Sequence, residues 1–152
     1  MARYVLDAPT LVHLVDSDLR IHPNHQLVAP NSVRSEALQL LLRDVQSGNR
    51  TERAALEAHE RITELKMRLL GDRVSRLTAW RIAREHGWDT LRDAEYVAIT
   101  RLQADALVTI DATLAERAAG LVPVAPVESL VTAMPGGSGE LRANRQERGR
   151  EG

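Results

Sequence analysis

Short, mainly apolar runs alternate with amphipathic helical segments along this chain, and the alternation restricts the fold more than any other feature. The runs are 3–6 (RYVL), 25–30 (HQLVAP), 106–110 (ALVTI) and 121–125 (LVPVA). They lack the polar and apolar alternation of a strand with one solvated face, which indicates strands covered on both faces. The sequence therefore predicts an α/β fold, a three-layer sandwich in which helices flank a central parallel sheet of four to five short strands.

Capping residues and apolar spacing predict the helices between these runs. Helices are expected within 7–18 and 31–48, over 51–70 and 73–86, and at 91–103 and 112–120. Asp72 and Gly87 would cap the two ends of the fourth helix. The long third helix is predicted because Ala55, Ile62 and Leu69 recur at every seventh position.

Length and composition bound the organisation of the chain. Its 152 residues fit one compact domain, which we expect over residues 1–133. Residues 134–152 are Gly-rich and charged, so a disordered C-terminal tail is expected there. Because the chain has no Cys, disulfides, thiolate metal sites and a Cys nucleophile are excluded. No apolar segment approaches the roughly 18 residues of a membrane span and no secretory signal is recognisable, so a soluble cytoplasmic protein is expected.

Arginine dominates the positive charge of the chain, whose formal net charge is −1. Ten basic residues lie between Arg43 and Arg84. The planar guanidinium group suits phosphate oxygens, so Arg73, Arg76, Arg81 and Arg84 are candidate phosphate contacts. A solvated helix face accounts for the same cluster equally well.

Carboxylates follow two of the apolar runs. Asp111 comes directly after the run 106–110, and Asp7 comes directly after the run 3–6. In open parallel sheets, ligands bind beyond the carboxyl ends of the strands, where the strand order reverses. We therefore expect both carboxylates at one edge of the sheet. Each also has a purely structural explanation, because each precedes a helix that it could cap.

Two further acids border the apolar faces of predicted helices. At about 100° per residue, Glu36 falls beside Leu40, and Asp93 lies one helical step before Val97. Glu36 could instead be an early-turn anion favoured by the helix dipole, and Asp93 could belong to a capping box that begins at Thr90. Capping alone, however, does not require four acids to meet at one edge of a sheet.

Four segments of the chain resemble the PIN-domain ribonucleases, in particular the VapC toxins of type II toxin–antitoxin modules. The segments are YVLDAPTLVHLV, NSVRSEALQLL, LRDAEYVAITRLQADALVTIDATLAE and LVPVAPVESL, and the resemblance covers about residues 2–131. It implies a PIN-like nuclease domain whose acidic motif consists of Asp7, Glu36, Asp93 and Asp111. Pro9 departs from the family, which often has Ser or Asn at this position.

Two threonines are expected to line the same site, on the substrate side of the acids. Thr10 follows Pro9 and could supply a hydroxyl in place of the Ser that the family often has at position 9. Thr109 agrees with the family pattern. The resemblance further implies that Asp7 and Asp111 bind a metal directly, that Asp93 is also a ligand, and that Glu36 completes a second site or orients the attacking water.

Oxygen-only ligands point to a hard cation, Mg²⁺ or Mn²⁺. Clustered carboxylates repel one another unless a cation neutralises them. Zinc sites of the common kinds are excluded, because the chain has no Cys and because Pro23 makes a helical pair of His22 and His25 improbable. The expected activity is hydrolysis of RNA phosphodiester bonds by a metal-activated water. The expected partners are the RNA substrate, a cognate antitoxin and a second copy of the chain, with no membrane.

Two other functions remain open at this stage. The departure at Pro9 leaves room for a catalytically silent PIN-like module that only binds RNA or protein. A phosphatase of the haloacid-dehalogenase type fits less well, because it needs a second Asp where this chain has Pro9.

Overall fold

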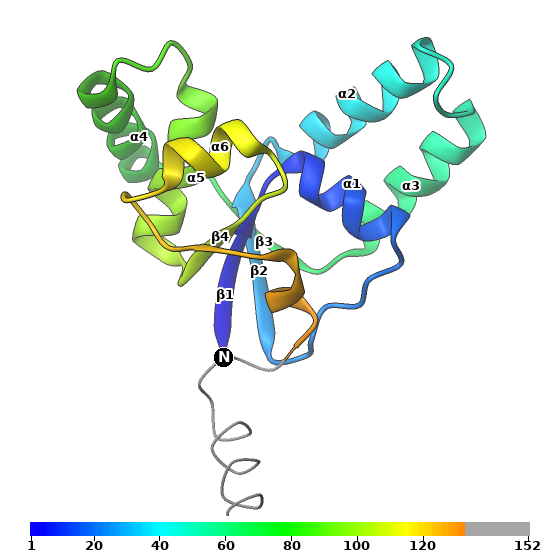
Figure 1. Ribbon diagram of the computed structural model, residues 1–152, viewed down its shortest axis with the longest axis horizontal. Helices are drawn as coiled ribbons and strands as arrows, with labels where there is room; N and C mark the ends of the chain where they lie inside the picture. Colours follow the sequence, from blue (N-terminus) through cyan, green and yellow to red (C-terminus); the bar gives the residue numbers. More distant parts are fainter. Residues whose placement is uncertain (133–152) are drawn as a thin grey trace, which may run out of the picture.

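Five parallel strands form the centre of the molecule, as a computed structural model of the protein shows for residues 1–132 (Figure 1). The strands are β1 (Ala2–Leu6), β2 (His25–Pro30), β3 (Met67–Leu70), β4 (Ala106–Val108) and β5 (Val124–Ala125). Their order in the sheet is β3-β2-β1-β4-β5, and every neighbouring pair is parallel. The predicted α/β sandwich is therefore confirmed, whereas the predicted tail, residues 134–152, lies outside the described residues.

Helices cover both faces of this sheet. The helices are α1 (Ala8–Asp16), α2 (Val33–Gln46), α3 (Glu52–Glu64), α4 (Arg73–His86), α5 (Leu91–Gln103) and α6 (Ala112–Ala118), followed by a 3-10 turn, η1 (Val127–Leu130). Figure 1 shows α1, α2 and α3 on one side of the sheet and α4, α5 and α6 on the other. Within residues 1–132, none of these helices is both long and apolar enough to cross a membrane.

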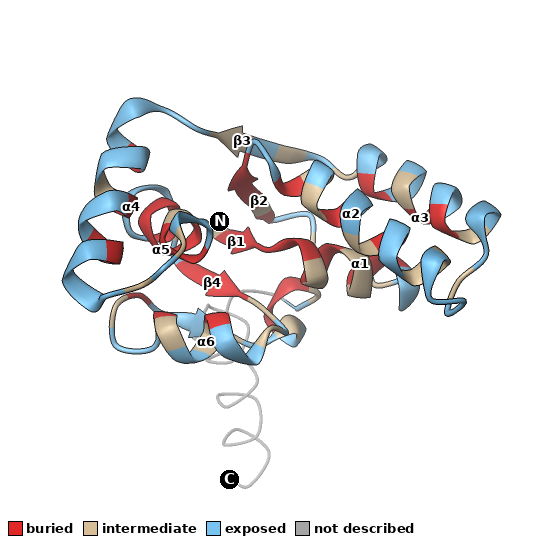
Figure 2. Cartoon of the chain, turned by 90° about the horizontal axis from the view of Figure 1, so that it is seen from above, coloured by how far each residue is buried: buried red, intermediate tan, exposed pale blue. Residues whose placement is uncertain are grey.

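The sheet separates two hydrophobic cores, which appear as the buried regions in Figure 2. Tyr4 and Leu6 of β1 enter the core formed with α1, α2 and α3. Val5 of the same strand enters the core formed with α4, α5 and α6, together with Leu107 of β4. Because successive strand residues point to opposite faces, both sets must be apolar, which explains the continuous apolar runs in the sequence.

The prediction of one helix over 51–70 is wrong. Helix α3 ends at Glu64, Leu65 adopts an extended conformation, and the strand β3 follows at Met67–Leu70. β3 lies at the edge of the sheet, where Leu69 pairs with Ala29 of β2 in parallel register. The spacing of apolar residues continues through Leu69, but a short apolar run is compatible with either a helix or a strand. Pairing with β2 decides between them, because the strand satisfies backbone groups at the open side of β2.

Two strands are shorter than the runs that predicted them. β4 ends at Val108, not at residue 110, because its partner β1 ends at Leu6, which pairs with Val108. β5 contains only Val124 and Ala125 of the predicted 121–125. The residues after Val108 have no partner strand, so they are free to turn toward the end of β1.

Candidate active site

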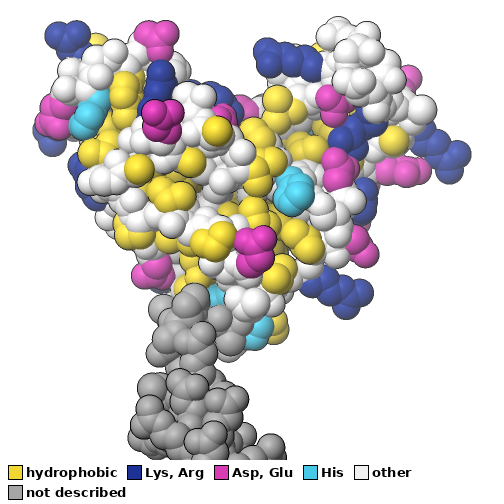
Figure 3. All heavy atoms as spheres, viewed as in Figure 1, with side chains coloured by type: hydrophobic (Ala, Val, Ile, Leu, Met, Phe, Trp, Pro, Cys, Tyr) yellow, Lys and Arg dark blue, Asp and Glu magenta, His cyan; other side chains and the backbone are white. Residues whose placement is uncertain are grey.

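The candidate site lies at the carboxyl ends of β1 and β4, two neighbouring strands in the middle of the sheet. The strand order reverses between them, since β2 and β3 lie beyond β1 and β5 lies beyond β4. This is the position at which open α/β sheets bind ligands. At the same end of the sheet, the space-filling view shows a surface hollowed between two lobes (Figure 3).

Asp7 is fully buried at the point where β1 ends and α1 begins. Its Oδ1 accepts hydrogen bonds from the backbone N–H of Thr10, at 3.3 Å, and from the Thr10 hydroxyl. Its Oδ2 accepts a hydrogen bond from the Thr109 hydroxyl at 2.6 Å. Burial raises the pKa of the Asp7 carboxyl, these hydrogen bonds oppose the shift, and the charge of Asp111 adds to it. Asp7 therefore both caps α1 and points into the site.

The two threonine hydroxyls join β1 to the segment that follows β4. Thr10 Oγ1 accepts a hydrogen bond from the backbone N–H of Ile110 at 3.1 Å, and Thr109 Oγ1 accepts one from the backbone N–H of Asp111 at 3.0 Å. Each hydroxyl also donates to Asp7. Both threonines predicted to line the site thus contact Asp7. Thr10 does so although it follows Pro9, the residue that differs from the PIN-domain pattern.

Asp111 caps α6 while facing the same end of the sheet. Its Oδ1 accepts hydrogen bonds from the backbone N–H groups of Thr113, at 2.9 Å, and Leu114, at 3.3 Å. The capping explanation is therefore correct for Asp111, as it is for Asp7. Capping does not conflict with the site explanation, because both acids also follow the carboxyl ends of neighbouring strands.

Glu36 is held by side chains from α5. Its Oε1 accepts a hydrogen bond from Arg92 Nε at 2.5 Å, and its Oε2 accepts one from the Tyr96 hydroxyl at 2.8 Å. Burial and the charge of Glu36 raise the pKa of Tyr96, so the phenol stays protonated and donates. Burial alone would lower the pKa of Arg92, but the contact with Glu36 outweighs it and the pKa is raised. Glu36 is thus a fixed, neutralised carboxylate.

Asp93 is buried and paired with an arginine from α6. Arg117 Nη1 donates to Asp93 Oδ2 at 2.9 Å, and Arg92 Nη1 lies 4.0 Å from Asp93 Oδ1. Thr90 caps α5, but the expected capping box is not formed, because Thr90 Oγ1 accepts from the N–H of Arg92 rather than from that of Asp93, and the Asp93 side chain bonds to Arg117. Arg92 therefore links Asp93 to Glu36, so these two acids belong to one network.

The structure brings the four predicted acids to one end of the sheet, as two pairs. Asp7 and Asp111 interact through their charges, and the charge of Asp7 also reaches Tyr96, the hydrogen-bond partner of Glu36. Within residues 1–132, no three acids or histidines lie close enough to hold a metal ion between them. The oxygen-only donors fit a hard cation chemically. In this arrangement, however, arginines neutralise one of the two pairs.

Three partners in this network were not found from the sequence. Tyr96 lies three residues after Asp93, on the same face of α5, so its position could have been noticed. Arg92 is adjacent to Asp93 in the chain but contacts Glu36 most closely. Arg117 comes from a different helix, and no local pattern connects it to Asp93.

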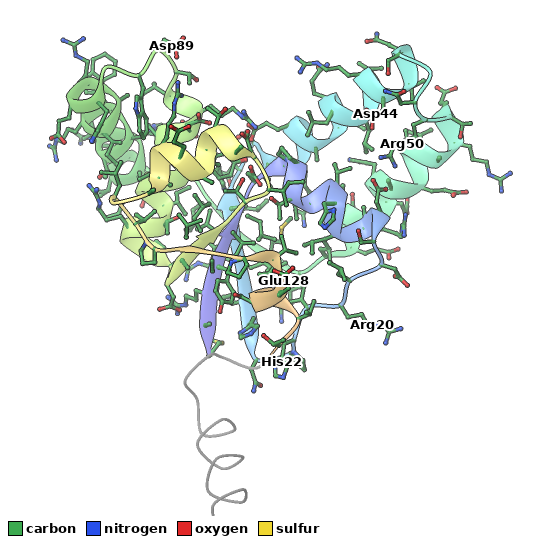
Figure 4. All side chains as sticks on the ribbon, viewed as in Figure 1. Arg20, His22, Asp44, Arg50, Asp89 and Glu128 are labelled. Carbon is green, nitrogen blue, oxygen red and sulfur yellow. The ribbon has the colours of Figure 1, made fainter. Side chains whose placement is uncertain are left out.

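Two histidines lie away from the acids, and one candidate arginine contacts the backbone. His22 and His25 have ring centroids 5.3 Å apart, and they lie near the start of β2, at the opposite end of the sheet (Figure 4). Arg76 of α4 donates to the backbone carbonyl of Gly71 at 2.8 Å. Figure 4 also shows Arg50 with Asp44 at the turn between α2 and α3, where they form a separate ion pair.

We expect Thr109→Val to destabilise the protein by about 1.5–3 kcal/mol, the range for a hydrogen bond to a charged group. The substitution keeps the shape of the side chain but leaves Asp7 Oδ2 and the N–H of Asp111 without this partner. Thr100→Val is the matched control, because the buried Thr100 hydroxyl donates only to the backbone carbonyl of Tyr96. Urea unfolding should show a smaller loss for Thr100→Val; equal losses would contradict the assigned role of Thr109.

Comparisons with known proteins bear on the fold. No protein-family model matches the chain, and no curated protein matches it in sequence. A solved structure of PAE2754 from Pyrobaculum aerophilum is similar, with a TM-score of 0.67 and 24% sequence identity over 86% of this chain and 94% of that one.

Two VapBC structures are similar as well. VapBC-1 from nontypeable Haemophilus influenzae matches with a TM-score of 0.57 and 16% identity, over 83% of this chain and 98% of that one. VapBC2 from Rickettsia felis, solved with a DNA fragment from its promoter, matches with a TM-score of 0.55 and 11% identity, over 82% and 98%. The chain therefore shares its fold with PAE2754 and these VapBC structures, which agrees with the PIN-like fold that the resemblance in the sequence implies.

Proposed function

We propose that the protein is a metal-dependent endoribonuclease, the toxin component of a toxin–antitoxin pair. The observation that carries the proposal is the placement of Asp7 and Asp111 at the ends of neighbouring strands, beside the network of Glu36 and Asp93. A buried acid whose pKa is raised, at the ligand-binding end of the sheet, is more typical of a functional site than of a structural one. The VapC-type fold supports the same conclusion.

In the proposed site, Mg²⁺ or Mn²⁺ would draw together Asp7, Asp93 and Asp111, which do not lie close enough to hold an ion in the arrangement described above, and Glu36 would orient the attacking water. A bound divalent ion lowers the pKa of water and neutralises charge on a phosphate that is being cleaved. The protein supplies preorganisation: Thr10 and Thr109 fix the Asp7 carboxylate from both sides. No protein nucleophile is required.

We further propose a cognate antitoxin as partner and a homodimer as the assembled state. Two of the similar structures are VapBC complexes, which supports a protein partner for this chain. In a cell, such a partner would keep the nuclease inactive until it is removed.

Incubation of the purified protein with a mixture of RNAs tests the proposed activity. Cleavage is expected with Mg²⁺ or Mn²⁺ and is expected to stop completely in EDTA, because the carboxylates need the ion to act on a phosphate. Mapping the cut ends would then identify the preferred RNA. Cleavage that continues in EDTA would contradict a metal-dependent reaction.

A silent RNA- or protein-binding module is the second candidate, and a specific observation favours it. Glu36 and Asp93 are already neutralised by Arg92 and Arg117, so the protein does not need a cation to tolerate them. A thermal melt with added Mn²⁺ separates the two functions. A ligand that binds only the folded state raises its stability by about 2.7 kcal/mol at one hundred times the dissociation constant, whereas a silent module should show no gain.

A further inference from the structure

Arg117 is anchored at Asp93 in a way that leaves part of its guanidinium group accessible. Its Nη1 donates to Asp93 Oδ2 at 2.9 Å, and its Nη2 lies 3.9 Å from the exposed carboxylate of Asp89. The guanidinium carbon lies 5.4 Å from the centroid of the Trp88 ring. The side chain is still 29% exposed. The aromatic ring and Asp93 therefore fix the position of this cation at the rim of the site.

Arg92 has the same relation to Glu36. Its Nε lies 2.5 Å from Glu36 Oε1, and its side chain is 43% exposed. The second carboxylate near it is Asp93, 4.0 Å from its Nη1. Two arginines of the chain itself therefore pair with Asp93, a proposed metal ligand, and with Glu36, the acid proposed to orient the attacking water.

A divalent cation and these guanidinium groups must compete for the same oxygens. Each cation near a carboxylate lowers the free energy gained by adding another. A partly exposed ion pair changes a binding constant by only about 1.4- to 5-fold. A divalent cation can therefore displace the guanidinium group from the carboxylate, and the guanidinium group can return when the cation leaves. An arginine released from a carboxylate keeps its charge and its planar fork, which matches a phosphate group equally well.

We propose that Arg92 and Arg117 exchange partners, pairing with Glu36 and Asp93 in the metal-free protein and with a phosphate of the RNA once a divalent cation is bound at Asp93, beside Glu36. This inference rests on the proposed function. The exchange leaves each charged group with a partner of opposite sign in both states, because the cation replaces the arginines at the acids and the phosphate replaces the acids at the arginines. The two arginines are thus substrate-binding residues that also limit metal binding in the absence of RNA.

Calorimetric titration of Mn²⁺ into the full-length protein tests the first half of the exchange. Arg117→Met keeps an apolar stem over Trp88 and removes the competing charge, so Mn²⁺ should bind about 1.4- to 5-fold more tightly than to the unsubstituted protein. Arg53→Met is the matched control, because it also removes one charge and breaks an ion pair, that of Arg53 Nε with Glu57 Oε1 at 3.1 Å, on the distant helix α3. Its Mn²⁺ affinity should not change.

The salt dependence of RNA cleavage tests the second half. If Arg117 contacts a phosphate, Arg117→Met should raise the KM for RNA and reduce the slope of log KM against log salt concentration by about one. Arg53→Met should leave both unchanged. Tighter Mn²⁺ binding combined with weaker RNA binding is a result that a merely structural role for Arg117 does not produce.

Equal or weaker Mn²⁺ binding by Arg117→Met would overturn the exchange while leaving the nuclease proposal intact. If neither the unsubstituted protein nor either variant binds Mn²⁺ or cleaves RNA, the proposed function fails and the exchange fails with it. Should Arg117→Met not fold, Arg92→Met applies the same test at the more exposed pair with Glu36.

Discussion

Replacing Asp7 or Asp111 by Asn is expected to lower the rate of metal-dependent RNA cleavage by about a hundredfold or more. Loss of a group that merely supports a metal ligand typically costs about 10- to 100-fold in activity, so loss of a ligand should cost at least as much. Asn keeps the shape of the side chain and can still accept the hydrogen bonds that cap α1 and α6. Gel-based cleavage assays in Mg²⁺ and Mn²⁺ measure the effect.

Asp105→Asn is a suitable control for these variants. Asp105 lies just before β4, at the opposite end of the strand from Asp111, and accepts a hydrogen bond from the N–H of Arg3 at 2.7 Å. Its cleavage rate should equal that of the unsubstituted protein. A folded double variant, Asp7→Asn with Asp111→Asn, that still cleaves RNA would refute the assignment of these acids.

Stability measurements separate loss of function from loss of fold in Asp7→Asn. Burial raises the pKa of Asp7, so ionisation of this carboxyl destabilises the folded protein. That penalty is present at pH 7 and disappears as the pH falls below the unfolded value of about 3.9, where both states are protonated. The Asn variant should therefore be relatively more stable at pH 7 than at pH 3.5.

Leu107→Ala is expected to destabilise the protein by about 2–5 kcal/mol, the range for deleting a large side chain from a tightly filled core. Leu107 is fully buried in β4, where it pairs with Val5 of β1 and Val124 of β5. Leu102→Ala is the matched control, because Leu102 lies 41% exposed on α5 and its loss should change stability by about 0.5 kcal/mol or less. Urea unfolding of both variants measures the difference.

An equal loss of stability for Leu107→Ala and Leu102→Ala would contradict the assignment of β4 to the middle of the sheet. The comparison also bears on the site, because β4 is only three residues long and leads directly to Thr109 and Asp111. A weakened β4 should therefore also weaken the alignment of Asp111 with Asp7.

The sequence was sufficient wherever a local signal fixed the structure. Asp72 caps α4 through the N–H of Ser75, and Gly87 ends it with φ of 66°, in the left-handed region that favours glycine. Both were predicted from single residues. β3 was missed because its residues are compatible with a helix, and only its pairing with β2, about 40 residues earlier in the chain, makes it a strand.

The candidate site likewise contains residues that local sequence signals predict and contacts that they do not. Asp7 and Asp111 could be predicted because each follows a buried strand and precedes a helix, a position that the sequence itself marks. The ion pairs of Glu36 with Arg92 and of Asp93 with Arg117 join different helices. Such contacts depend on how α2, α5 and α6 are placed on the sheet, which no spacing along a single segment can reveal.

The bonds from Thr10 and Thr109 that fix Asp7 have a consequence for a chain still emerging from the ribosome. Thr10 and Ile110 are joined by a hydrogen bond across about one hundred positions of the chain, and β1 lacks its neighbour β4 until that distance has been translated. A growing polypeptide that ends before residue 104 has neither Thr109 nor Asp111 with which to complete the acid pair. If the proposed function is correct, the acid pair would therefore stay incomplete during synthesis until Asp111 has been translated.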